Sequence, residues 1–268
     1  MLARMGGAGE SFARRYGAWA VVAGASAGIG AAFAADLASR GMHLLLIARR
    51  GGVLEEVAAR IRADHGVEVR CVAGDLADSD TVGAVSATLD GEDLGVLVYN
   101  AASVPLGPFL DADFEEIDRA VAVNVRGPLA FAHALLPGMC ERGRGAMVLM
   151  SSLSGLQGTP GIAAYAAGKA FNIILGEGLW GELRDRGIDV SVCCSGAVRT
   201  PGYSRFSKKD APGVLSPERM VRQTLDALGK GPRFVPGGTN RFTAQLMGRL
   251  LPRKTAIGII ARMTRRLS

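Results

Sequence analysis

The chain has 268 residues, 49% of them hydrophobic, and carries 31 Lys and Arg against 25 Asp and Glu, a formal net charge of +6. This length accommodates one large core and is short for two, so we expect a single domain over residues 1–268. Internal repeats, low-complexity stretches and apolar runs of membrane-spanning length are absent from the sequence, which argues against a repeat protein and a membrane-spanning protein.

Cysteine and histidine usage argues against a metal site. The three histidines are scattered, and no metal-ligand spacing relates the four cysteines, Cys71, Cys140, Cys193 and Cys194. We expect reduced thiols in a cytoplasmic protein. Arg14-Arg15 and the uncharged stretch Trp19–Ala35 resemble a signal peptide, but a strand, a glycine turn and a helix are the better interpretation of that stretch.

Apolar periodicity predicts strands that alternate with helices. The predicted strands are Ala20–Ala23, Leu44–Ala48, Val67–Ala73, Val96–Tyr99, Ala146–Met150, Val190–Cys194 and Phe234–Val235. The predicted helices are Gly28–Ser39, Val53–Asp64, Ser79–Leu89, Phe114–Met139, Ile162–Arg186 and Pro217–Leu228. This alternation indicates an α/β fold, a doubly wound, Rossmann-type parallel sheet of about seven strands with helices on both faces. The aperiodic segment 196–216 is long for a structureless connection, and we expect a mobile substrate lid there.

A glycine-rich turn follows the first predicted strand. It contains Gly24, Ser26, Gly28, Ile29 and Gly30 and leads directly into a helix. Glycines let the backbone approach a pyrophosphate, and the free N–H groups of a helix N-terminus favour the anion. A glycine-rich turn is often only a turn, but its place in the first strand–helix unit of an alternating chain favours a dinucleotide site.

The end of the second predicted strand bears on the choice of cofactor. Proteins that bind NAD with this fold place an acid there, to hold the 2′-hydroxyl of the adenosine ribose. Here the strand ends in Arg49-Arg50. Guanidinium groups match a phosphate in charge and geometry, and Ser26 offers an additional hydroxyl. We therefore favour NADP (NADPH) over NAD, although two arginines that merely solvate a loop would give the same sequence.

Asn124 lies inside a predicted helix, four residues before Pro128. Proline has no N–H, so the carbonyl oxygen of Asn124 loses its helical partner and is free to hold a water molecule. The simpler interpretation is that Gly127-Pro128 kinks the helix. The two are compatible, because the kink supplies the free acceptor.

Ser152, Tyr165 and Lys169 carry a hydroxyl, a phenol and an ammonium that can meet at one carbonyl group. Tyr165 and Lys169 are four residues apart, which on a helix places their Cβ atoms roughly 5–6 Å apart on one face. Ser152 follows a buried strand, and strand ends are where open α/β sheets build their sites. We expect Lys169 to lower the pKa of Tyr165 towards neutrality, where a general acid/base works best.

Together these features resemble the short-chain dehydrogenase/reductase family, from about Phe12 to the C-terminus. Asn100-Ala-Ala after the fourth strand and Asn124 at the head of Asn-Val-Arg-Gly add to the resemblance. It implies that Asp75 contacts adenine, that Lys169 binds the nicotinamide ribose, and that Asn124 holds a water that connects the lysine to solvent. It implies further cofactor contacts from Leu76, Asn100, Ala101, Tyr165, Gly196, Val198 and Thr200.

The chain departs from the family pattern at three positions. Ala23 stands where threonine is usual, Ala102 where glycine is usual, and Ser195 where proline usually precedes the glycine after the sixth strand. None of these changes removes a catalytic group. Ser195 frees the backbone that leads into the lid, whose shape is therefore the least determined part of the site.

The resemblance implies an NADP(H)-dependent oxidoreductase that transfers a hydride between the nicotinamide and a carbonyl or secondary alcohol. Tyr165 would donate the proton, and Ser152 would hydrogen-bond the carbonyl oxygen. A lipophilic ketone of steroid, polyketide or 3-oxoacyl type fits the mostly apolar residues expected near the cleft, Val104, Leu106, Leu153, Leu156, Val198 and Tyr203; an ordinary core role for them stays open. The alternative class is a non-catalytic dinucleotide-binding regulator or scaffold, which loss of Tyr165 or Lys169 would have favoured.

The family commonly forms homodimers or homotetramers through two long helices, which here correspond to Phe114–Met139 and Ile162–Arg186. The second helix repeats an apolar residue every four positions, at Phe171, Leu175, Leu179 and Leu183. Such a stripe suits a partner helix. The core-facing side of the helix would give the same pattern.

The C-terminal extension 238–268 is basic and amphipathic. Nine Lys and Arg and no Asp or Glu occur from Ala227 onward. We expect Pro252 to divide two helices, and favour a cover over the cleft or a neighbouring subunit above peripheral contact with an anionic membrane. Nucleic acid is disfavoured because no recognised binding motif accompanies the charge. The helices combine apolar residues Leu246, Met247, Leu250, Ile257, Ile260, Ala261 and Met263 with Arg249, Arg253, Lys254, Arg262, Arg265 and Arg266.

Overall fold

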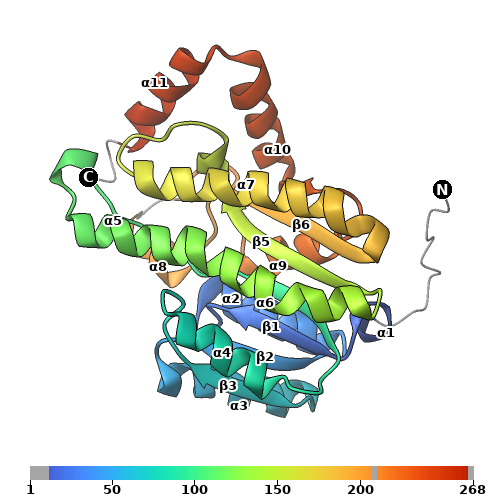
Figure 1. The fold of residues 1–268 in the computed structure, drawn as a ribbon. Coiled ribbons are helices and arrows are strands. Elements are labelled where there is room, and N and C mark those ends of the chain that lie inside the picture. The colour runs from blue at the N-terminus through green and yellow to red at the C-terminus, as the bar shows by residue number, and fades with distance from the viewer. Residues whose placement is uncertain (1–11, 207–209, 265–268) are drawn as a thin grey trace.

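Seven parallel strands form one sheet in the order β3-β2-β1-β4-β5-β6-β7 (Figure 1). The computed structural model describes residues 12–206 and 210–264. The predicted strand number and parallel sheet are confirmed, and the strand ends differ from the prediction by one or two residues. The strands are β1 (Trp19–Ala23), β2 (His43–Ala48), β3 (Val69–Ala73), β4 (Leu94–Tyr99), β5 (Gly145–Ser152), β6 (Ile188–Ser195) and β7 (Arg233–Phe234).

Alternate side chains of the central strands enter two separate apolar layers, because successive residues of a strand point to opposite faces. One layer packs beneath α2 (Gly28–Ser39), α3 (Gly51–His65) and α9 (Pro217–Leu225). The other packs beneath α4 (Ser79–Thr88), α6 (Gly127–Glu141) and α7 (Ala163–Leu183). Cys193 lies in the first layer and Cys194 in the second, as their adjacency on a strand predicts. The short helix α1 (Phe12–Tyr16) is tied to β6, where the Tyr16 hydroxyl donates to Asp189 at 2.8 Å.

A π-helical turn, Ala122–Arg126, separates α5 (Phe114–Val121) from α6. The predicted uninterrupted helix over this region is therefore wrong in detail. The N–H of Gly127 donates to the carbonyl of Ala122, and the Tyr99 hydroxyl donates to the carbonyl of Val123 at 2.7 Å. A side chain from the end of β4 thus takes a carbonyl that a regular helix would use. Such π turns occur often at functional sites.

The segment 196–216 has more structure than we expected. It contains α8 (Pro201–Phe206) and a parallel bridge between Val198 and Leu215, while positions 207–209 lie outside the described residues. The amide of Asn240, in the first turn of α10 (Gly238–Gln245), donates to the carbonyls of Gly213 and Pro236. These bonds anchor the returning end of the segment, so the structureless connection predicted here is corrected to a short helix between bridged ends.

The C-terminal residues form two helices on either side of Pro252, as predicted. These are α10 (Gly238–Gln245), which continues as a π turn over Leu246–Leu250, and α11 (Arg253–Thr264). In Figure 1 they form the red projection beyond the sheet. Arg265, Arg266 and the side chains of Arg249, Leu250 and Met263 lie outside the described residues. Within the described part of the chain, no helix is both long and apolar enough to cross a membrane.

The α11 helix packs on the turn that follows β5. Arg253 donates to the carbonyl of Leu156 at 3.1 Å, and Ile257 reaches the backbone at Gly158. Ala256, next to Ile257 in the helix, is fully buried. The opposite face keeps Lys254 and Arg262 exposed. The expected amphipathic character is therefore present in the described part of the helix.

Candidate active site

The carboxyl ends of β1, β4 and β5 meet where the strand order reverses, since β1 pairs with β2 on one side and β4 on the other. Open α/β sheets bind ligands at such a switch point. The glycine turn starts there. Gly24 donates its N–H to the carbonyl of Ile47, and the Asn100 amide donates to the carbonyl of Gly24 at 3.0 Å. Neighbouring strand ends thus fix the turn from both sides.

The turn is shaped for close approach of a ligand to the backbone. Gly28 has φ +55°, and a Cβ on Gly30 would lie 1.9 Å from the carbonyl oxygen of Gly24. The residues present therefore fit a dinucleotide pyrophosphate, which needs a bare backbone at a helix N-terminus. Ser26 and Ile29 lie partly exposed in the same turn. Thr200 of the lid reaches it, because a Cβ on Gly28 would meet the Thr200 methyl at 3.0 Å.

Arg49 and Arg50 lie at the end of β2, as predicted, and both are exposed. Neither forms an ion pair with a carboxylate in the described part of the chain. Arg49 lies close enough to Asp75 for its charge to help lower the pKa of that carboxyl group. Both guanidinium groups are nevertheless exposed to a ligand beside the glycine turn.

Asp75 follows β3 and is held by a residue that sequence analysis missed. Arg119, on α5, donates to Asp75 Oδ2 at 2.7 Å, and the N–H of Ala77 donates to Oδ1 at 3.1 Å. Partial burial works to raise the pKa of Asp75, but these hydrogen bonds and the charges of Arg119 and Arg49 prevail and the pKa is lowered. Asp75 is thus a fixed carboxylate acceptor. Leu76, next to it, is buried. No local motif marks Arg119, because the contact joins residues 44 positions apart.

Ser152 is the last residue of β5 and caps the turn Leu153–Leu156, where its hydroxyl oxygen accepts from the N–H of Ser154 at 3.2 Å. The Ser154 hydroxyl also donates to it at 2.9 Å. The neighbouring Ser151 hydroxyl donates to the carbonyl of Lys169 and ties β5 to α7. The predicted trio is brought together, since Ser152 also shares a hydrogen bond with Tyr165.

The electrostatics of the trio differ from the prediction. Burial raises the pKa of Tyr165, and its hydrogen bond with Ser152 only opposes that rise. The Lys169 ammonium is buried, lies 5.5 Å from the Tyr165 ring centroid, and donates to the carbonyl of Met150 at 2.8 Å. Burial lowers the pKa of Lys169 to about 8. The expected lowering of the Tyr165 pKa by Lys169 is therefore not found, because the protein buries both groups and turns the ammonium toward a backbone carbonyl.

Asn124 lies in the π turn and is buried. Its side-chain oxygen accepts from the N–H of Ser103 at 3.0 Å, and its amide donates to the carbonyl of Ser103 at 2.7 Å. These two hydrogen bonds hold the Asn124 side chain to the loop after β4. The backbone carbonyl of Asn124 lacks its regular helical donor, since Pro128 has no N–H. Ser103 carried no signal in the sequence, because it contributes only backbone atoms.

The expected substrate-facing residues divide into two groups. Val104 and Leu106, on the loop after β4, are exposed. Leu153 and Leu156 are partly buried against the core, and Val198 is buried. Tyr203 is partly buried, and its hydroxyl accepts from the N–H of Ala211. Only the first group offers apolar surface without a core role.

The remaining cofactor candidates line the same edge of the sheet. Ala101 packs beside Gly24, and Gly196 packs against the buried Asn240 amide. Asn240 is a second residue that sequence analysis missed. In the described residues, no group of three or more His, Cys, Asp or Glu is arranged to hold a metal ion.

Comparison with known proteins agrees with this arrangement. Residues 18–211 match the family model described as short chain dehydrogenase. A 7beta-hydroxysteroid dehydrogenase of Clostridium sardiniense is 32% identical over 234 residues, which are 86% of this chain and 90% of the relative. A very-long-chain 3-oxoacyl-CoA reductase of Anas platyrhynchos is 36% identical over 220 residues, 80% of this chain and 69% of the relative.

A solved 7beta-hydroxysteroid dehydrogenase superposes with a TM-score of 0.89 at 28% identity, over 94% of this chain and 99% of the other. The unmatched part of this chain is shorter than the segment 238–264. At least part of the C-terminal helices is therefore matched as well. The sheet, the glycine turn and the matched sequence together establish that the chain is an oxidoreductase that belongs to the short chain dehydrogenase family.

Proposed function

We propose that the protein is an NADPH-dependent carbonyl reductase for lipophilic ketones, and that in the reverse direction it oxidises the corresponding alcohols. The observation that carries this proposal is the placement of Ser152 and Lys169 next to Tyr165 at the carboxyl edge of the sheet, beside a turn that fits a dinucleotide. A bound nicotinamide cofactor supplies the hydride. The protein supplies position, a proton and charge stabilisation.

Tyr165 is the proton donor in this proposal. Its raised pKa keeps the phenol protonated at neutral pH, as reduction requires. Ser152 orients the carbonyl oxygen of the substrate and already hydrogen-bonds the phenol. Lys169 holds a buried proton with a pKa of about 8, near the working range of a proton relay. The backbone carbonyl of Asn124 would anchor the water that links Lys169 to solvent.

NADPH rather than NADH is proposed from the exposed Arg49 and Arg50. They stand where an NAD-binding protein of this fold carries an acid, and neither forms an ion pair with a carboxylate of the described residues, although Arg49 acts electrostatically on Asp75. The fixed carboxylate of Asp75 would accept from the adenine amino group. Lipophilic substrates are supported by the apolar Val104 and Leu106 and by two relatives whose names specify a hydroxysteroid and a 3-oxoacyl-CoA.

We also propose a homodimer through α5, α6 and α7. The predicted stripe on α7 does not support it, because Leu175 and Leu179 pack against the core and Leu183 is buried. The support comes from other apolar side chains on these helices, which are exposed by 75% at Phe114, 42% at Leu129 and 69% at Ile174. Light scattering that shows a monomer at micromolar concentration would contradict this assembly.

For the C-terminal helices we propose a cover over the turn after β5. The contacts of Arg253 and Ile257 with that turn support this role over membrane contact. The protein is then expected to stay in solution when anionic vesicles are sedimented at low salt. Binding to anionic but not neutral vesicles would favour the membrane alternative.

Tyr165→Phe tests the proposed function. The change removes one hydroxyl and little volume, so we expect NADPH to bind while turnover of a ketone panel falls by at least ~10²-fold. Turnover is followed as NADPH consumption, and cofactor binding by fluorescence titration. A variant that keeps most of its kcat would refute the role of Tyr165, and a wild-type protein that binds NADPH but reduces no carbonyl would favour the non-catalytic alternative.

A further inference from the structure

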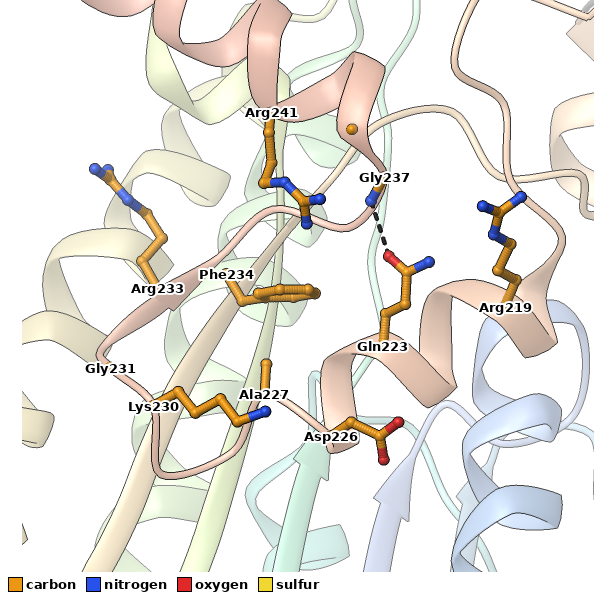
Figure 2. A pocket seen from close by; sticks show the side chains of 11 residues that line it. Arg219, Gln223, Asp226, Ala227, Lys230, Gly231, Arg233, Phe234, Gly237 and Arg241 are labelled. Carbon is orange, nitrogen blue, oxygen red and sulfur yellow. Dashed lines mark hydrogen bonds between the residues drawn. The ribbon is translucent and has the colours of Figure 1, made fainter.

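A pocket of about 520 Å³ lies apart from the catalytic trio, where α9, the turn before β7 and the start of α10 meet (Figure 2). Its size lies within the ~300–1,000 Å³ typical of small-molecule sites. Four cationic side chains line it, against the single carboxylate of Asp226: Arg219, Lys230, Arg233 and Arg241.

Most of this positive charge is uncompensated. Asp226 is already paired with Arg40 at 2.8 Å, and Arg233 lies 3.5 Å from Glu177. No carboxylate of the described residues forms an ion pair with Arg219, Lys230 or Arg241. A concave surface lined by one sign of charge raises the local concentration of the opposite ion. The lining therefore favours an anion with more than one charge.

The uncharged part of the lining suits an aromatic group. In Figure 2 the Phe234 ring lies at the middle of the pocket, with Arg241 above it and Lys230 below. The Phe234 side chain is only partly buried. Gln223 accepts from the N–H of Gly237 at 3.0 Å, which fixes its amide and leaves the amide nitrogen as a donor. An aromatic face among cations is a combination that binds phosphorylated nucleotides, because the base stacks and the guanidinium groups meet the phosphates.

A second hollow of about 390 Å³ adjoins this pocket on the side of the turn after β5. It shares Arg233, Phe234 and Arg241 with the first and extends to Leu156, in the turn that follows Ser152. The strand register gives the separation. Phe234 pairs with Cys193, and Ser195 pairs with Ser152. Two residues along β6 and two strand spacings place the Cα atoms of Phe234 and Ser152 about 12 Å apart.

We propose that the basic pocket binds the phosphorylated adenosine end of a coenzyme A thioester, whose acyl arm passes through the adjoining hollow to Ser152. This inference rests on the proposed function and names its substrate class. The 3′-phosphate and pyrophosphate match the uncompensated cations, and the adenine matches the Phe234 face. A steroid without an anionic substituent has no group that would use either feature, so the pocket favours the thioester over such a steroid.

The test compares two substrates with one acyl chain, a 3-oxoacyl-CoA and its N-acetylcysteamine thioester, which lacks the nucleotide. The readout is the ratio of their kcat/KM values in the wild type and in Arg219→Glu and Arg241→Glu. We expect the ratio to favour the coenzyme A thioester and to fall by about tenfold or more in each pocket variant. Arg60→Glu makes the same change in net charge on α3, far from the pocket, and should leave the ratio unchanged.

A binding measurement separates the nucleotide pocket from the cofactor site. In protein saturated with NADPH, calorimetry should detect coenzyme A at one further site, and both pocket variants should lose it while thermal unfolding stays near that of the wild type. Arg241→Gln serves as a milder variant if Arg241→Glu unfolds. Adenosine 3′,5′-bisphosphate should compete with the thioester and not with NADPH.

Any of five outcomes would overturn the inference. An unchanged ratio in both pocket variants would do so, as would failure of coenzyme A to bind NADPH-saturated protein. Binding of adenosine 3′,5′-bisphosphate with no effect on thioester reduction would assign the pocket to a free nucleotide. Reduction of steroid ketones without reduction of either thioester would refute this inference and leave the proposed function intact, whereas failure to reduce any carbonyl would refute both.

Discussion

The turn after β1 and the segments after β5 and β6 lie at the same edge of the sheet but are held in different ways. Backbone atoms shape the first, where a Cβ on Gly30 would collide with the carbonyl of Gly24. Side chains fix the others by donating hydrogen bonds to backbone carbonyls: Lys169 to Met150, Asn240 to Gly213 and Arg253 to Leu156. The first arrangement admits few residue types, and the second depends on individual long-range contacts. The nucleotide side is thus intolerant of added atoms, and the substrate side is open to redesign.

The largest effect on stability and cofactor binding is expected in the turn after β1, where the backbone leaves no room for a Cβ atom. Gly30→Ala forces a Cβ to within 1.9 Å of a backbone oxygen, so we expect a loss of about 3 kcal/mol or more in the free energy of unfolding and no measurable NADPH binding. Gly258→Ala is the matched control, because nothing lies within 4 Å of a Cβ on that α11 residue. It should stabilise the protein by up to ~1 kcal/mol. Urea unfolding and cofactor titration of both variants measure the contrast, and equal effects would contradict it.

The sequence predicts the backbone-shaped turn after β1 well, because its pattern is local. Glycine turns, strand periodicity and the spacing of Tyr165 and Lys169 are local, so the sheet and the trio are predictable from short windows. Arg119, Asn240 and the π turn are not, because each depends on a partner far along the chain. The α7 stripe fails differently. A four-residue repeat marks one face of a helix but does not say whether that face meets the core or a partner, and here Ile174 rather than Leu179 is exposed.

A buried cation on the side-chain-held part should make stability depend on pH. The pKa of Lys169 is about 8 in the folded protein, whereas the ordinary value of a lysine, taken for the unfolded chain, is 10.5. The unfolded chain therefore binds more protons between pH 8 and pH 10.5. The free energy of unfolding should therefore rise with pH across this window, by on the order of 3 kcal/mol relative to Lys169→Met. Below pH 8 the penalty for burying the charge is fully present. Urea unfolding at several pH values measures the slope.

The control for this prediction is Lys254→Met, which removes an exposed lysine of α11. Its stability relative to the wild type should stay constant over the same pH window. A flat difference between the wild type and Lys169→Met would show that the buried ammonium is compensated as fully in the fold as in water.

Arg49→Asp tests the end of β2, where binding of the nucleotide is proposed to depend on exposed side chains. The change removes a phosphate partner and supplies an acceptor for a 2′-hydroxyl, so the ratio of NADPH to NADH affinity should fall by about 100-fold. Arg60→Asp makes the same charge change on the outer part of α3 and should leave the ratio unaltered. Titrations with both cofactors give the ratio. An unchanged value in Arg49→Asp would show that another group holds the phosphate.

The smallest effect is expected at the contact between α11 and the turn after Ser152. Arg253→Ala removes one exposed hydrogen bond to the carbonyl of Leu156, which should cost less than ~1 kcal/mol. Because Leu156 belongs to the turn capped by Ser152, amides of 153–158 should exchange faster with solvent while NADPH affinity stays unchanged. Lys254→Ala, on the outer face of the same helix, should alter neither. If Arg253→Ala lowered cofactor affinity as well, the two sides of the edge would be coupled, and the contrast between a backbone-shaped and a side-chain-held region would no longer describe two independent parts.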